Sequence, residues 1–522
     1  MSLDAVALEV MAHAFASVAE EMGLVLIHSA LSPNIRERRD CSAALFDAQG
    51  EMIAQAAHIP VHLGAMADAV AAVRAQSHAP QPRPGEIFLL NDPYTGGTHL
   101  PDLTLVGAID ADGQIGGYSV VRAHHSDVGG MQPGSMPAGA RDLFAEGIVI
   151  PPVRLTPDVE RLVLANVRTP VMRHGDLAAQ RAAVERGAEG LRALAARYGW
   201  DGVRAATRDL MDYAERRTRA GLAALPAASS GGGQATDWME GDGVTESDLP
   251  IAVRVEIREG VFHADFTGTA PAGPGNVNCP LAVTRSAVLF VVRTLLAEDV
   301  PMNAGVQRAV RVSAPDGCLV SARWPSAVAA GNVETSQRIT DVVFLALAGA
   351  GVPVPAQGQG TMNNVTLGGG GSGTGGVWTY YETIGGGQGA GPHGPGPSGV
   401  HVGMSNTRNT PVEVLELECP VRVARYELRR GSGGAGKWLG GDGVVREFEA
   451  LASLEASLLT DRRRHAPRGA AGGGDGALGR NLLNDRPLPA KGAVRLAPGD
   501  VLRIETPGGG GWGKATRERS ER

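Results

Sequence analysis

The sequence predicts an α+β protein of more than one domain, with a mixed α/β N-terminal part followed by a glycine-rich, strand-rich part. The chain has 522 residues, which exceeds one typical domain of roughly 100–200 residues. Hydrophobic residues make up 43% of it, enough to build large cores. Glycine contributes 73 residues, about twice its usual share of roughly 7%, which indicates many tight turns and close backbone approaches.

Charge and cysteine content exclude several classes of protein. The net charge of −7 is too mild and too mixed for a nucleic-acid or membrane-surface protein. Four cysteines lie far apart without a CxxC pair, which excludes a disulfide scaffold and a zinc finger. The N-terminus lacks a signal-peptide pattern, and the apolar stretch 286–297 is too short for a membrane span. We therefore expect a cytoplasmic chain that binds neither nucleic acid nor membrane.

Helical and stranded patterns alternate through the first 225 residues. The apolar spacing predicts a helix over 4–31, a hairpin over 41–54 and a helix over 63–76. A short strand at 87–90 precedes two strands at 103–109 and 115–123, which are joined through Asp110–Gly113. Two long helices are predicted between 176 and 225, with a break near Gly199.

Residues 226–234, rich in Pro, Ser and Gly, predict a linker. Short Val/Ile-rich strands at 251–257 and 261–266 follow, and then long glycine-rich loops. The predicted units are residues 1–228 with the metal site, residues 235–515, and a disordered tail at 516–522. Residues 367–403 predict an ordered loop region, because they include aromatic residues and histidines.

The strongest chemical signal is a cluster of histidines and aspartates in the first quarter of the chain: Asp92, His99, Asp102, His124, His125 and Asp127. If the hairpin turns at residues 111–112, His99 faces His124 across the ladder. A slip of one or two residues still leaves both histidines at one end of the hairpin.

Two imidazoles and a carboxylate at one place suit zinc or manganese. A fourth ligand could come from the charged run Arg36–Asp40, which precedes an apolar strand. The alternative for any single histidine is that it only satisfies a loop or a strand end. Residues 431–437 look like a phosphate-binding loop, but Trp438 stands where Ser or Thr should bind Mg²⁺. The sequence therefore offers a metal site and no nucleotide site.

Long ordered motifs, spread over almost the whole chain, resemble the B subunit of the hydantoinase/oxoprolinase family. They are Glu37–Asp40, Asn91–Asp102, His124–Gly130, Asn166–Pro170, Gly175–Gln180, Gly331–Gln337, Tyr381–Ala390, Asn406–Glu413, Ser432–Gly436 and Pro507–Gly513. Two small departures, Cys41 for a more usual Phe and Trp438 for a more usual Tyr, touch none of the candidate ligands.

The resemblance implies one subunit of a two-component, ATP-dependent enzyme that opens a cyclic amide. In this family a separate A subunit with an actin-like fold binds ATP and phosphorylates the amide, and the B subunit completes hydrolysis at a metal site. Carried over, Asp40, His99, Asp102 and His124 match the ligands of zinc or manganese. Asp92 or His125 would orient the ligands or act as general base. We expect a heteromer with the A subunit, an A2B2 heterotetramer or larger.

Two alternatives remain at this point. Within the family the chain could be an α-type subunit of a ketone carboxylase, similar to those of acetone or acetophenone carboxylase. From another class, it could be a scaffold that only stabilises an A subunit, although a scaffold needs no converging ligands. We also expect the stretch Gly385–Gly399 to wall the substrate passage, and replacement of Gly386 and Gly387 by Ala to leave the fold intact.

Overall fold

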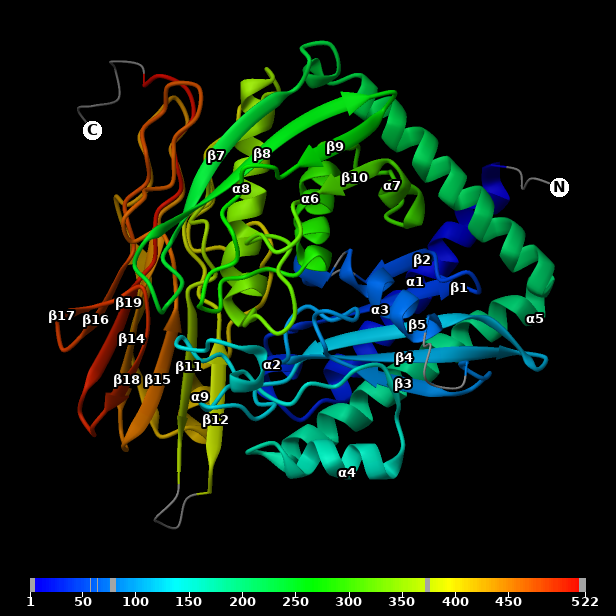
Figure 1. Cartoon of the computed structure of the whole chain (residues 1–522), viewed down its shortest axis with the longest axis horizontal. Helices are drawn as coiled ribbons and strands as arrows, with labels where there is room; N and C mark the ends of the chain where they lie inside the picture. The colour runs from blue at the N-terminus through cyan, green and yellow to red at the C-terminus, as the bar shows by residue number, and fades with distance from the viewer. Residues whose placement is uncertain (1–4, 57, 63, 76–80, 371–375, 516–522) are drawn as a thin grey trace.

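The structure, a computed structural model, describes residues 5–56, 58–62, 64–75, 81–370 and 376–515. Within these residues the strands form four sheets, of six, four, four and five strands. The N-terminal sheet lies at one side of the molecule and the C-terminal strands at the other, with α6 and α8 between them (Figure 1). The predicted α+β class is confirmed. The predicted tail, residues 516–522, lies outside the described residues.

The N-terminal sheet has the strand order β2-β1-β5-β4-β3-β6. Its strands are β1 (Cys41–Asp47), β2 (Met52–Ala56), β3 (Ile87–Leu90), β4 (Asp102–Ala111), β5 (Gln114–His124) and β6 (Val153–Arg154). One face packs against α1 (Ala5–Ser29) and α5 (Pro170–Ala223), and the other against α3 (Ala65–Arg74). Because both faces are covered, β4 is buried from Asp102 to Ile109 and reads as a nearly continuous apolar run.

The hairpin of β4 and β5 turns at Asp112 and Gly113, one residue later than predicted. Both residues have positive φ, 55° and 84°, as a two-residue type I′ turn requires. A bulge after Ile109 shifts the ladder by one more residue, so Asp102 rather than His99 pairs with His124. The predicted register is therefore wrong, but both histidines lie at the same end of the hairpin.

Helix α1 is apolar enough to resemble a membrane span. An 18-residue window within Val6–Ser29 has a mean hydropathy of 1.5, and the helix is long enough to cross a bilayer. In the structure Phe15, Met22 and Leu26 instead pack into the core beneath the N-terminal sheet. The burial of this face accounts for part of the apolar character of the segment, whereas Val6, Val10 and Leu24 are exposed.

Helix α5 contains the two helices predicted between residues 176 and 225. They meet at Gly199, whose backbone angles are non-helical (φ 73°, ψ 153°), so the predicted break is confirmed. The predicted linker holds the turn η3 (Pro226–Ala228) and the first residues of the next strand. Met136 and Ala214 share a core with Ile251 and Phe262 from beyond it. The division into units 1–228 and 235–515 stays a prediction.

The second sheet, in the order β10-β9-β8-β7, packs against two helices of the middle of the chain. Its strands are β7 (Gly233–Glu240), β8 (Asp248–Arg258), β9 (Val261–Asp265) and β10 (Val310–Ser313), and the helices are α6 (Leu281–Thr294) and α8 (Ser336–Gly349). A π-helical turn, Gly331–Thr335, leads into α8. The shorter helices and turns are α2 (Pro33–Arg36), η1 (Pro60–His62), η2 (Leu143–Ala145), α4 (Pro157–Ala165), α7 (Ala304–Arg308) and α9 (Val412–Glu418).

The C-terminal part contains two sheets, with the strand orders β12-β11-β15-β18 and β13-β14-β19-β16-β17. The first contains β11 (Asn364–Gly369), β12 (Trp378–Glu382), β15 (Leu454–Leu459) and β18 (Lys491–Leu496). The second contains β13 (Val421–Arg429), β14 (Gly443–Ala450), β16 (Arg480–Leu483), β17 (Arg486–Leu488) and β19 (Val501–Glu505). Their inner faces share one apolar cluster, which includes Val365, Phe448 and Leu502.

Much of the glycine surplus lies in a glycine layer, which we define as the irregular segments 386–390, 433–441, 469–474 and 508–513. Backbone hydrogen bonds run sideways between these segments, for example from Gly441 N to Gln388 O and from Gly509 N to Gly441 O, both 2.9 Å. A Cβ on Gly441 would lie 1.8 Å from the backbone oxygen of Pro397. Only glycine permits backbones to pack this closely.

The glycine layer bears on the expectation that Ala at positions 386 and 387 leaves the fold intact. A Cβ on Gly386 would lie 2.1 Å from Gln359 Oε1, and one on Gly387 would lie 2.0 Å from the backbone oxygen of Gly441. Replacement of either by Ala therefore forces its neighbours to move, and the expectation of an intact fold is wrong.

Candidate metal centre

The candidate metal centre lies where the hairpin of β4 and β5 opens. Asp102 is the first residue of β4 and pairs with His124, the last residue of β5. His99 reaches the same place from the loop before β4, because the Asp102 N–H donates to the His99 backbone oxygen (3.1 Å) and closes a tight turn. The backbone oxygen of Asp40 accepts from the His124 N–H (3.0 Å) and brings the start of β1 alongside.

Three ligand atoms converge at this point. Asp102 Oδ1 lies 3.1 Å from His99 Nε2 and 3.4 Å from His124 Nδ1. The two imidazole nitrogens are 3.2 Å apart. Donor atoms held at about 2.1 Å from one divalent ion lie about 3.0 Å apart at a right angle and about 3.4 Å apart in a tetrahedron. The observed spacings fall within this range.

The hydrogen-bond partners indicate that two of the three converging atoms, His99 Nε2 and Asp102 Oδ1, carry lone pairs. His99 Nδ1 lies 3.4 Å from the backbone oxygen of Ala329, which places the ring proton on Nδ1 and leaves Nε2 as an acceptor. Asp102 Oδ1 has no hydrogen-bond donor among the described residues. Acceptors that face each other in a buried site are stabilised by a cation between them.

The electrostatics favour an ionised Asp102. Burial alone would raise its pKa, but the neighbouring His99 and His62 hold the pKa well below its usual range. Burial lowers the pKa of His124, although Asp102 opposes this. The centre therefore combines an ionised carboxylate with His124, whose charged form burial disfavours. A carboxylate and a neutral imidazole are the forms that bind a metal.

A cavity of about 20 Å³ adjoins two of the three converging residues, Asp102 and His124, and is large enough for one water molecule or ion. Besides Asp102 and His124, its polar lining consists of Asp40, His62, Asn332, Tyr381, Thr383, Ser405 and Thr407. Asp40, the fourth ligand that the resemblance implies, thus lines the cavity, outside the tight group of three. A further donor that lines the same cavity can complete the coordination of an ion that the three residues hold.

The two residues expected to orient ligands or act as base face other partners. Asp92 Oδ1 accepts from the Tyr94 N–H and Oδ2 from the Thr95 hydroxyl, both at 2.9 Å, so its carboxylate organises its own loop. His125 Nε2 lies 2.9 Å from Gln180 Oε1 on α5. Burial lowers the pKa of His125 to about 4. Neither residue lines the cavity.

Three residues that the sequence reasoning did not assign to the centre contribute to it. His62 Nε2 lies 3.4 Å from Asp102 Oδ2, and Asn332 Nδ2 lies 3.5 Å from the same oxygen. The Tyr381 ring stacks on His124 with 4.3 Å between ring centroids. Asn332 and Tyr381 belong to motifs that carried the resemblance, whereas His62, from a short loop before α3, had no signal in the sequence.

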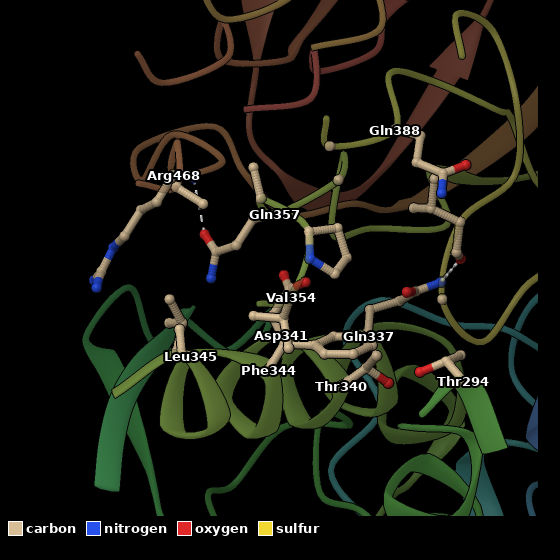
Figure 2. Close-up of a pocket in the computed structure, with 18 of the residues that line it drawn as sticks. Thr294, Gln337, Thr340, Asp341, Phe344, Leu345, Val354, Gln357, Gln388 and Arg468 are labelled. Carbon is tan, nitrogen blue, oxygen red and sulfur yellow. Dashed lines mark hydrogen bonds between the residues drawn. The ribbon is translucent and has the colours of Figure 1, made fainter. Parts of the chain in front are cut away.

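A larger pocket of about 370 Å³ lies between α8 and the loops opposite it (Figure 2). Asp341, Phe344 and Leu345 project from α8, and Val354 and Gln357 face them from the loops. The Gln357 side chain is held at both ends, by the Arg468 N–H (2.9 Å) and by Asp237 (2.9 Å). This pocket and the metal cavity have no lining residue in common.

Comparison with known proteins identifies the lineage of the chain. Residues 4–515 match the family described as hydantoinase B/oxoprolinase. The 5-oxoprolinase 1 of Arabidopsis thaliana is 36% identical over 98% of this chain, which spans only 42% of that relative. A Pseudomonas sp. protein provisionally named as the B subunit of a D-/L-hydantoinase is 29% identical over 100% of this chain and 92% of its own length.

Two solved structures share the fold. The ATP-dependent caprolactamase from Pseudomonas jessenii superposes with a TM-score of 0.88 at 28% identity, over 98% of this chain and 92% of that chain. A nucleotide-free acetone carboxylase superposes with a TM-score of 0.87 at 17% identity, over 98% of this chain and 76% of that chain, a likeness of fold alone.

Proposed function

The chain belongs to the hydantoinase B/oxoprolinase family, and we propose that it completes the metal-assisted hydrolysis of a cyclic amide that a partner has activated with ATP. The observation that carries this proposal is the buried group of His99, Asp102 and His124, whose ligand atoms have the spacing that one divalent ion requires. Mixed imidazole and carboxylate ligands suit Zn²⁺ or Mn²⁺.

Each residue at the centre has a distinct task in this proposal. His99 Nε2, His124 Nδ1 and Asp102 Oδ1 hold the ion, with Asp40, which lines the adjoining cavity, as fourth ligand. When bound, such an ion polarises a carbonyl group and makes water a stronger acid. The small cavity limits the water that can reach the reacting group.

Asp102 and His124 are fixed by neighbours that do not bind the ion. The Thr98 hydroxyl donates to Asp102 Oδ2 at 2.5 Å, which turns Oδ1 toward the histidines. The stacked ring of Tyr381 holds the plane of His124, and the Tyr381 hydroxyl is itself anchored on Asn364 (2.8 Å). Such outer partners set the geometry and basicity of metal ligands.

The activating step needs a nucleotide, and the sequence of this chain offers no convincing nucleotide motif. We assign ATP to a hydantoinase A-type partner, in an A2B2 assembly or larger. A relative named as the B subunit of a hydantoinase, almost as long as this chain, supports a separate partner. This chain spans 42% of the Arabidopsis 5-oxoprolinase, and the rest of that protein is long enough to contain an ATP-binding part. A cytoplasmic location stays a prediction.

Assay of the chain co-expressed with a hydantoinase A-type subunit tests this function. The pair should open a lactam ring only with ATP present. With His99→Ala the ring-opened product should be lost, while ATP consumption persists because it occurs on the partner. Equal product from wild type and His99→Ala, or ring opening by wild type without ATP, would contradict the proposal.

A further inference from the structure

Of the three converging side chains at the metal centre, His99 alone lies outside the strands of the hairpin. Asp102 and His124 are fixed by ladder pairing, whereas His99 reaches the same point from the preceding loop. The other nitrogen of its ring, Nδ1, lies 3.4 Å from the backbone oxygen of Ala329. The position of that oxygen therefore influences where His99 Nε2 points.

Glu146 holds the backbone at Ala329. Ala329 stands two residues before the π-helical turn Gly331–Thr335, where a helical run begins. The first N–H groups of such a run have no partner within it. Glu146 Oε1 accepts from the Ala329 N–H at 2.8 Å and from the Val328 N–H at 3.0 Å, and Oε2 lies 3.1 Å from Val328 N. A distant carboxyl group thus caps this run.

The Glu146 side chain is itself held firmly. It is 0% exposed, and its N–H donates to the Leu143 backbone oxygen (3.1 Å) in the turn η2. The Leu143 N–H donates in turn to the Pro325 backbone oxygen (2.9 Å), which joins the two segments at a second point. Among the described residues, the hydrogen bonds that the Glu146 carboxyl group accepts come from Val328 and Ala329.

The two contacts form a short chain from Glu146 through Ala329 to His99. Peptide groups are planar, so only two soft dihedral angles separate the N–H of Ala329 from its carbonyl group. Fixing the N–H on a buried carboxyl group therefore restricts the direction of the carbonyl oxygen. That oxygen is the partner of His99 Nδ1.

We propose that Glu146 is a positioning residue of the metal centre, which holds the Ala329 backbone in place and thereby aims His99 Nε2 at the other two ligands. This inference rests on the proposed function and goes beyond it, because Glu146 does not line the metal cavity. Loss of an outer partner of a metal ligand typically lowers metal affinity about 10- to 100-fold. Glu146 acts one contact further out, so we expect the lower end of this range.

The imidazole N–H signal of His99 tests the positioning without any metal. In the full chain with ¹⁵N-labelled histidine, the Nδ1–H that donates to Ala329 should give a downfield proton signal, identified by its loss in His99→Ala. Glu146→Met removes the carboxyl group from an unbranched side chain and should shift or broaden this signal. Glu146→Gln should retain it, because the amide oxygen can replace Oε1, which accepts from both N–H groups.

Mn²⁺ titration of the metal-depleted chain gives a second readout. Glu146→Met should weaken Mn²⁺ binding about tenfold, and Glu146→Gln should stay within about twofold of wild type. Glu240→Met is the matched control, because Glu240 is also buried and accepts from the N–H groups of residues 463–465, none of which lines the metal cavity. The control should keep the wild-type His99 signal and Mn²⁺ affinity.

If Glu146→Met does not fold, Glu146→Asp takes its place, because it keeps a carboxyl group but withdraws it by one methylene. It should change the His99 signal and the Mn²⁺ affinity in the same direction. Absence of the signal in wild type, or wild-type values in the folded Met or Asp variant, would overturn the proposal. So would failure of Glu146→Gln to retain them, or an equal effect of Glu240→Met.

The two readouts separate this inference from the proposed function. A wild-type chain that binds neither Mn²⁺ nor Zn²⁺ would contradict the metal-assisted function, while the His99 signal still decides whether Glu146 positions the ring. A chain that binds metal equally well in wild type and Glu146→Met, with an unchanged signal, would leave the function standing and refute the role of Glu146.

Discussion

Asp102 carries the negative charge of the three converging side chains. It is 1% exposed, and its two oxygens face His99, His124 and His62 at 3.1–3.4 Å. The carboxylate supplies negative charge to a site whose other two converging side chains are imidazoles. The fixed orientation of this one side chain therefore decides whether the three ligand atoms can converge.

Thr98→Val tests the orientation of Asp102. The change keeps the volume of the side chain but removes the hydroxyl that donates to Asp102 Oδ2. Loss of such an outer partner typically lowers metal affinity about 10- to 100-fold, and we expect that loss here. Mn²⁺ titration of the metal-depleted chain measures it, with Thr284→Val, buried far along the chain on α6, as control. Equal Mn²⁺ affinity in Thr98→Val and wild type would show that Thr98 does not position the ligand.

Glu146 gives the protein a pH-dependent stability. Its carboxyl group accepts from the N–H groups of Val328 and Ala329, yet burial raises its pKa to about 8 from an ordinary value of 4.5. The folded state therefore binds more protons than the unfolded state between these values. The stabilisation by the proton is complete below pH 4.5 and is lost as pH rises through 8.

Glu146→Gln should remove this dependence, because the amide stays neutral. We expect wild type to lose on the order of 2 kcal/mol from this group between pH 5 and pH 7, and the variant to lose none of it. Denaturant unfolding at the two pH values measures the difference. Equal pH slopes for the two proteins would mean that Glu146 ionises normally.

At the residue scale, the sequence could predict which three side chains converge but not their surroundings. His99, Asp102 and His124 are close in sequence and are brought together by one hairpin, so local pattern was sufficient. Asn332 and Tyr381 reach the centre from segments more than 200 residues away, through tertiary packing that no local pattern contains. The partners of Asp92 and His125 likewise depend on loop and helix geometry.

At the scale of elements, the hairpin of β4 and β5 determines which residues meet. The hydrophobic pattern predicted both strands, but placed the turn at Ala111 and Asp112. The dipeptide Asp112–Gly113 is a strong type I′ signal, and the bulge after Ile109 has no such signal in the sequence. Register was therefore less predictable than the existence of the strands.

Gly113→Ala tests the turn that closes this hairpin. Gly113 has φ of 84° and no atom within 4 Å of an added Cβ, so the cost is conformational alone, about 1 kcal/mol. Gly139→Ala is the control, since its Cβ also meets nothing and its φ lies outside the left-handed region. Chemical denaturation should show a loss for Gly113→Ala only, and equal stability of the two variants would contradict the turn assignment.

At the scale of the whole molecule, the centre joins parts of the chain that sequence analysis divided. Asp102 and His124 belong to the N-terminal sheet, whereas Asn332 precedes α8 and Tyr381 lies on β12. Composition predicted a glycine-rich second part but gave no sign that it would complete the metal cavity. A site built this way requires both parts to be folded.

The glycine layer is the feature of the whole molecule most sensitive to substitution. A Cβ on Gly441 would lie 1.8 Å from a backbone oxygen, whereas one on Gly394 would meet nothing within 4 Å. We expect Gly441→Ala to cost about 3 kcal/mol or more through overpacking and Gly394→Ala to cost little. Thermal unfolding compares them, and similar Tm values would show that the layer tolerates side chains.

Metal content is the most direct test of the central claim that His99, Asp102 and His124 hold one divalent ion. Elemental analysis of the purified wild-type chain should find close to one zinc or manganese ion per chain. His99→Ala should lose most of it, while His125→Ala, altered at a neighbouring histidine that faces Gln180, should keep it. A wild-type chain without stoichiometric metal, or a His99→Ala variant with its full metal content, would contradict the account.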